Sequence, residues 1–110
     1  MEETIKEFLR AWQKQNYSKM YDLCQITWKS KHNRSKLKSM LHKRIVGFEI
    51  QSIDVNPNVP TVADISVKVK ISGKVKHLTI RMIQEVGVRM SSVKGTWGVN
   101  PISALKNLYV

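Results

Sequence analysis

Glu85 is the side chain whose position in this sequence most suggests acid–base chemistry. It is the only carboxylate in the last 46 residues and lies inside an apolar, β-type run, so burial would raise its pKa and make it a general base. The alternative is an outward-facing carboxylate that pairs with Arg81 or Arg89. Asp22, next to Tyr21, is a second candidate base, although the helix surface is the usual place for an aspartate.

The other groups that could act as nucleophiles, bases or metal ligands lack a catalytic or metal-binding spacing. The histidines lie among polar or basic neighbours, with no acidic residue nearby in sequence to orient them: His32, His42 and His77. The single cysteine, Cys24, lies in an apolar helical pattern, which is typical of a buried structural thiol. The sequence contains no zinc-ligand spacing, glycine-rich phosphate loop or G-x-S-x-G motif. We therefore assign no catalytic residue, metal or cofactor.

A basic segment is the strongest compositional feature of the chain, whose formal net charge is +11. Between Asp22 and Glu49 there is no acidic residue, while seven cations fall there: Lys29, Lys31, Arg34, Lys36, Lys38, Lys43 and Arg44. Such a segment is either a solvated helix face that keeps the protein soluble or a site for phosphates or an acidic partner. Trp28 adjoins the segment, but one aromatic residue does not make a stacking platform for nucleic acid bases.

The first half of the chain has the periodicity of helices. Residues 3–15 carry one apolar stripe at helical spacing. Ser18 is expected to cap a second helix that continues to Trp28, and Ser35 to cap a third, shorter one that buries Leu37, Met40 and Leu41. Gly47 is expected to end the helical part.

The second half alternates with the period of two that is typical of strands. A first strand starts at Phe48, residues 55–62 form a loop, and VADISVKVKIS is a half-buried strand whose outer row includes Lys68 and Lys70. Gly73-Lys74 is the predicted hairpin turn. The returning strand turns inward either Leu78, Ile80 and Met82 or the alternate row with Ile83 and Glu85.

A fourth strand is predicted for VKGTWGVN, with Val93, Trp97 and Val99 on one side and Asn100-Pro101 at its end. The predicted elements amount to a single α+β domain over residues 1–110, with three N-terminal helices packed on a curved antiparallel sheet. Six residues are expected to be mostly buried in its core: Trp12, Leu23, Val67, Val69, Ile80 and Trp97.

The stretch FLRAWQKQNYSKMYDLC resembles the opening of nuclear transport factor 2-like (cystatin-like) domains, and Gly95-Thr96-Trp97 is similar to their closing strand. The variety most like this chain is the small accessory domain of bacterial transpeptidases and plasmid-transfer proteins. The resemblance implies a cone-shaped half-barrel with a cavity between helices and sheet. Its candidate lining residues are Tyr21, Asp22, Glu85 and Trp97. The resemblance also implies a homodimer through the open sheet face, which like charges on Lys68 and Lys70 would oppose.

Three functions are compatible with these features. The leading hypothesis is a non-catalytic binding or assembly module with a cationic surface and an unknown protein partner. The second is a small-molecule enzyme or ligand-binding protein that uses the cone cavity, and the third is nucleic-acid binding through the segment 29–44.

The expected location is cytoplasmic. The sequence has no apolar run near the roughly 18 residues of a membrane span, its N-terminus is acidic and amphipathic rather than signal-like, and one cysteine suits a reducing compartment. An extracytoplasmic location is the alternative if a leader or anchor precedes these residues.

Overall fold

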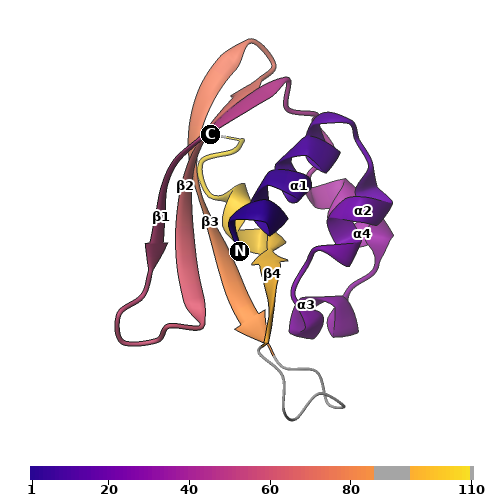
Figure 1. Ribbon diagram of the computed structural model, residues 1–110. Helices are drawn as coiled ribbons and strands as arrows, with labels where there is room; N and C mark the ends of the chain where they lie inside the picture. The colour runs from indigo at the N-terminus through magenta and orange to yellow at the C-terminus, as the bar shows by residue number, and fades with distance from the viewer. Residues whose placement is uncertain (86–94, 110) are drawn as a thin grey trace.

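The computed structural model describes residues 1–85 and 95–109 as a helical layer against one face of a four-stranded sheet (Figure 1). The helices are α1 (Glu2–Gln13), α2 (Tyr17–Asp22), α3 (Ile26–Lys31) and α4 (Arg34–Met40). The strands are β1 (Gly47–Val55), β2 (Val62–Ile71), β3 (Lys74–Glu85) and β4 (Thr96–Asn100), followed by the 3-10 helix η1 (Pro101–Leu105). The strands are antiparallel and follow chain order across the sheet. The predicted α+β class with a curved sheet is confirmed.

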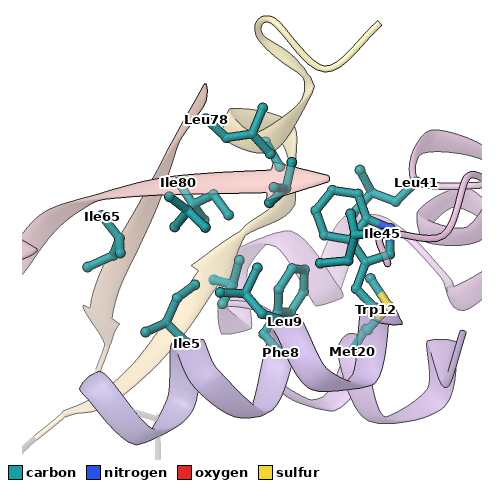
Figure 2. Close-up of a cluster of buried hydrophobic side chains, with 14 of the residues drawn as sticks. Ile5, Phe8, Leu9, Trp12, Met20, Leu41, Ile45, Ile65, Leu78 and Ile80 are labelled. Atoms are coloured by element: carbon teal, nitrogen blue, oxygen red, sulfur yellow. The ribbon is translucent and has the colours of Figure 1, made fainter. Parts of the chain in front are cut away.

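The stripe of α1 forms the centre of the core. Ile5, Phe8, Leu9 and Trp12 are fully buried. The first three point toward the sheet, whereas Trp12 lies beside Leu41 and Ile45 (Figure 2). Glu2 and Glu3 lie in the first turn, where carboxylates interact favourably with the helix dipole. The Trp12 indole N–H donates to the carbonyl of Lys43 at 2.8 Å, so its one polar atom is satisfied. Side chains therefore fill the space between α1 and the sheet.

The predicted second helix is two helices, so four α-helices precede the sheet rather than three. The chain leaves α2 at Leu23 and runs extended past Cys24, which pairs in parallel with Val99 of β4. The backbone N–H of Gln25 donates to the Val99 carbonyl at 2.9 Å, and the N–H of Val99 donates to the Leu23 carbonyl at 2.9 Å. These bonds to a distant strand replace helical ones. The bend leaves Leu23 partly buried and packed against the core.

The helix caps are asparagines rather than the predicted serines. The side chain of Asn16 accepts from the N–H of Lys19 and begins α2. The side chain of Asn33 accepts from the N–H of Lys36 at 2.9 Å and begins α4. Each asparagine stands two residues before the serine that was expected to cap, because asparagine and serine both accept well at an N-cap and only the backbone path decides between them.

The β2–β3 hairpin confirms one of the two predicted inner rows. Ala63, Ile65 and Val67 oppose Met82, Ile80 and Leu78 in the register, and all six are buried. The turn lies one residue earlier than predicted, at Ser72 and Gly73, whose φ values of 52° and 75° suit a two-residue hairpin. The edge strand β1 has a bulge between Ile50 and Ser52.

Strand β4 begins at Thr96, because Gly95 is not part of it, and Val93 lies outside the described residues. Val99 is fully buried, whereas Trp97 is partly buried and packs against the edge of the core. Gly98 lies so close to the bend after α2 that a Cβ there would be 2.5 Å from the Cα of Gln25. Asn100 ends the strand as expected and caps η1 by accepting from the N–H of Ile102.

Candidate functional site

Glu85 lies at the end of β3 and holds the start of α3. Its carboxylate accepts from the backbone N–H of Ile26 at 2.6 Å, from the N–H of Thr27 at 3.3 Å, and from the Thr27 hydroxyl. The N-cap residue of α3, Gln25, makes no side-chain capping bond, so the glutamate supplies that function from a distant strand. Neither suggested ion pair applies in the described residues: Arg81 pairs with Asp64 at 3.0 Å, and Arg89 lies outside them.

Asp22 and Trp97 share a hollow of about 200 Å³ between the end of α2, the start of α3 and β4. Lys29 also lines this hollow, and its ammonium group donates to the backbone carbonyl of Asp22 at 3.2 Å. Tyr21 and Glu85 are not among its lining residues. The Tyr21 hydroxyl instead donates to the backbone carbonyls of Lys29 and His32, at 3.0 and 2.7 Å. The four candidate residues thus lie in one region of the molecule but do not face one space.

The lining of this hollow is a mixture of polar and apolar residues. Asp22 is exposed, and no histidine lines the hollow. Cys24 also lines it, but burial raises the pKa of its thiol to about 12, and the sulfur donates to the Met20 carbonyl. Among the residues that the structure describes, no group of three or more His, Cys, Asp or Glu side chains could hold a metal ion.

The basic segment extends over α3, α4 and the loop that leads to β1. Leu37 and Leu41 are buried as predicted, and Met40 is half-buried, so α4 packs by its apolar side. Of the seven cations only Lys29 is partly buried, and the other six are exposed. Within residues 1–85 and 95–109, none of the seven forms an ion pair with a carboxylate. Arg34 donates to the Ser18 hydroxyl instead.

A second group of cations was not singled out from the sequence. Lys74 and Lys76 of β3 lie around a hollow of about 230 Å³ together with Lys43 of the basic segment. In the sequence these two lysines alternate with Val75. Only the register of β3 against β2 shows that the lysines, and not the valine, lie on the inner face of the sheet.

In the described part of the chain, no helix is both long enough and apolar enough to cross a bilayer. Residues 1–100 match the family model described as NTF2-like N-terminal transpeptidase domain. No curated protein and no solved structure matches the chain.

Proposed function

Because this chain belongs to the family of NTF2-like N-terminal transpeptidase domains, we propose that it is a non-catalytic binding module that docks on an acidic protein surface. The fold alone does not choose a function, since it carries enzymes and adaptors alike. The choice comes from the surface of α3 and α4 and from the engagement of Glu85 in capping α3.

The observation that carries this proposal is the separation of charge over the molecule. Five of the eight carboxylates pair with cations outside the basic segment: Glu2, Glu3, Glu7, Glu49 and Asp64. The cations at 29–44 have no such carboxylate among the described residues. An uncompensated group of exposed cations creates a local positive potential that attracts and orients an anionic partner.

An acidic protein is favoured over nucleic acid because the indole that adjoins the segment in sequence is buried. Trp28 is 5% exposed and packs against Tyr21 and His32. It is therefore not available to stack on a base, which is the usual second component of a single-strand site. Nucleic-acid binding through phosphate contacts alone is the alternative that the experiment distinguishes.

The family also bears on location. Its description refers to transpeptidases, and we propose that this chain works beside such an enzyme outside the cytoplasm, in place of the cytoplasmic location expected from the sequence. The single cysteine is buried and forms no disulfide, which is compatible with either compartment. Fractionation of cells that express the native gene product would test this, and recovery in the cytosol would contradict it.

The test compares binding to polyglutamate and to a random DNA duplex at increasing salt. Lys36→Ala/Lys38→Ala removes two exposed charges from α4, and Lys14→Ala/Lys106→Ala removes two elsewhere as a matched control. We expect the first variant to weaken polyglutamate binding much more than the control, with little loss of stability because exposed charges contribute little to folding. If duplex DNA is the true ligand, its salt slope should instead fall by about 1.8 log units per log of salt, at roughly 0.9 per phosphate.

Wild-type protein that binds neither polymer at about 50 mM salt would contradict a polyanion-docking role. Equal weakening by the α4 variant and its control would show that net charge, rather than this surface, governs binding.

A further inference from the structure

The inner row of β3 changes from apolar to cationic at the hairpin end. Met82, Ile80 and Leu78 are buried on the core side, and alternation places Lys76 and Lys74 next on the same side. The register confirms this, because Lys76 opposes Val69 and Lys74 opposes Ile71, both of which are buried inner-face residues of β2. Val75, which points outward between them, is 53% exposed. The usual alternation of apolar residues inward and polar residues outward is therefore inverted here.

The two strand lysines line the hollow of about 230 Å³ together with a third cation, Lys43. The loop that carries Lys43 is held in place, because the backbone carbonyl of Lys43 accepts a hydrogen bond from the buried indole of Trp12. Tyr109 forms another wall, fixed by its hydroxyl donating to the Met40 carbonyl at 2.7 Å and by stacking on His42. Ser72 adds a hydroxyl, and no carboxylate is among the described lining residues.

We propose that this hollow is a binding site for a phosphate group, carried either by a small soluble molecule or by a lipid headgroup. Lys43 and Lys74 line the same hollow, so their positive charges repel each other, and a dianion bound between them removes that repulsion. Lysine ammonium groups bind phosphate as point charges without the planar fit that arginine gives to carboxylates. The hollow is smaller than the roughly 300–1,000 Å³ of drug-sized ligand sites, which suits a phosphate with a small substituent.

The proposal rests on Lys43 and Lys74 and is separate from docking by α4. Lys43→Gln/Lys74→Gln removes both charges, while Lys36→Gln/Lys38→Gln removes the same net charge from α4 as a control. Inorganic phosphate is titrated into each protein and followed by amide chemical shifts in NMR spectra. In the wild type we expect saturable shifts around Ser72 and Gly73. In the Lys43/Lys74 variant we expect at least about ten-fold weaker phosphate binding, because hydrogen bonds to charged groups contribute more to binding than neutral ones and two of them are lost. The control should keep wild-type affinity for phosphate.

A second arm distinguishes the two sources of phosphate. Vesicles of phosphatidylcholine with added phosphatidate present the group on a membrane, and vesicles of phosphatidylcholine alone do not. Co-sedimentation with the first kind only, lost in the Lys43/Lys74 variant, assigns a lipid headgroup. Saturable phosphate binding without co-sedimentation assigns a soluble ligand. If the double variant does not fold, the single variant Lys43→Gln, at an exposed loop residue, carries the same comparison.

Two results would overturn the site. One is a wild-type protein whose spectrum shows no saturable response to phosphate and which ignores phosphatidate vesicles. The lysines would then serve only to cover the end of the core with their aliphatic stems. The other is an equal loss of phosphate binding in the α4 control. That result would show that the net charge of the protein, and not this hollow, governs phosphate binding. Neither result bears on polyglutamate binding by α4, so the two proposals fail separately.

Discussion

Trp12 and Trp97 show how differently the same side chain is used at two positions. Trp12 is fully buried, packs edge-on against Phe8, and has its indole N–H bonded to the Lys43 carbonyl. Trp97 is half-buried at the end of the molecule where α3 meets β4, beside Asp22 and Lys29. The first is a core residue that also fixes the loop of Lys43. The second lines a surface hollow, where its loss removes less packing.

Trp12→Ala should destabilise the protein by about 3–5 kcal/mol, because it leaves a large cavity and an unpaired carbonyl. Trp97→Ala should cost clearly less, below about 3 kcal/mol, since part of that ring already contacts solvent. The measurement is urea unfolding of both variants and of Trp12→Phe, which keeps most of the apolar volume. Equal losses for the two alanine variants would contradict this assignment of roles.

At the scale of elements, the short helices depend on polar groups at their first turns. Helices α2, α3 and α4 have six or seven residues each, too few to be stable alone in water. Asn16 and Asn33 supply the caps of α2 and α4 from within the local sequence, whereas Glu85 supplies that of α3 from β3. The helical layer is therefore stabilised partly by caps and partly by the sheet it covers.

Asn16→Ala and Asn33→Ala should each cost about 1 kcal/mol, the usual value for an N-cap that loses its acceptor. Ser18→Ala and Ser35→Ala are the matched controls and should stay within roughly 0.5 kcal/mol, because these exposed serines do not cap. Thermal or urea unfolding of the four variants decides the matter. A serine variant that is less stable than its asparagine counterpart would restore the caps predicted from the sequence.

Gly98→Ala should disrupt the junction between β4 and the bend after α2. The new Cβ would lie 2.5 Å from the Cα of Gln25 and 2.7 Å from its backbone nitrogen, so backbone would have to move. We expect a loss of at least about 1–3 kcal/mol, as for other overpacked sites, and faster amide exchange at Gln25 and Val99. Gly47→Ala is the control, since a Cβ there meets nothing within 4 Å. Unchanged exchange in Gly98→Ala would contradict the tight junction.

At the scale of the whole molecule, the two faces of the sheet differ sharply. The inner face is covered by the helices (Figure 1). The outer face carries charges of both signs. Lys68 pairs with Glu49 at 3.7 Å, and Arg81 pairs with Asp64 at 3.0 Å. Lys68 is thus partly neutralised, which weakens the expected repulsion between two copies that meet through this face.

A homodimer through the open sheet face remains our prediction for the protein in solution. Light scattering at micromolar concentration should give twice the chain mass of 12.7 kDa. Thr79→Arg adds a charge to the exposed outer row of β3 and should shift the protein to monomer, whereas Ser39→Arg on α4 adds the same charge without effect. A wild-type monomer would contradict the dimer, and dissociation by both variants would move the interface away from the sheet.

The parts of the fold that depend on residues close together in the sequence can be predicted from the sequence. The stripe of α1 and the alternation of β2 are local periods of 3.6 and two, and their partition between core and solvent is set by the apolar side chains themselves. The same reasoning located the 29–44 cations and the burial of Leu37 and Leu41. The candidate cavity residues came from family resemblance, and of these only Asp22 and Trp97 share a hollow.

Other features arise only when distant segments meet. The break between α2 and α3 depends on backbone hydrogen bonds to Val99, and the cap of α3 depends on Glu85. The hollow at the hairpin end needs Lys43 from a loop and Lys74 from a strand. No local window contains both partners of these contacts. A backbone hydrogen bond or a group of charges between remote segments is decided by tertiary packing, and that packing can override local helix propensity.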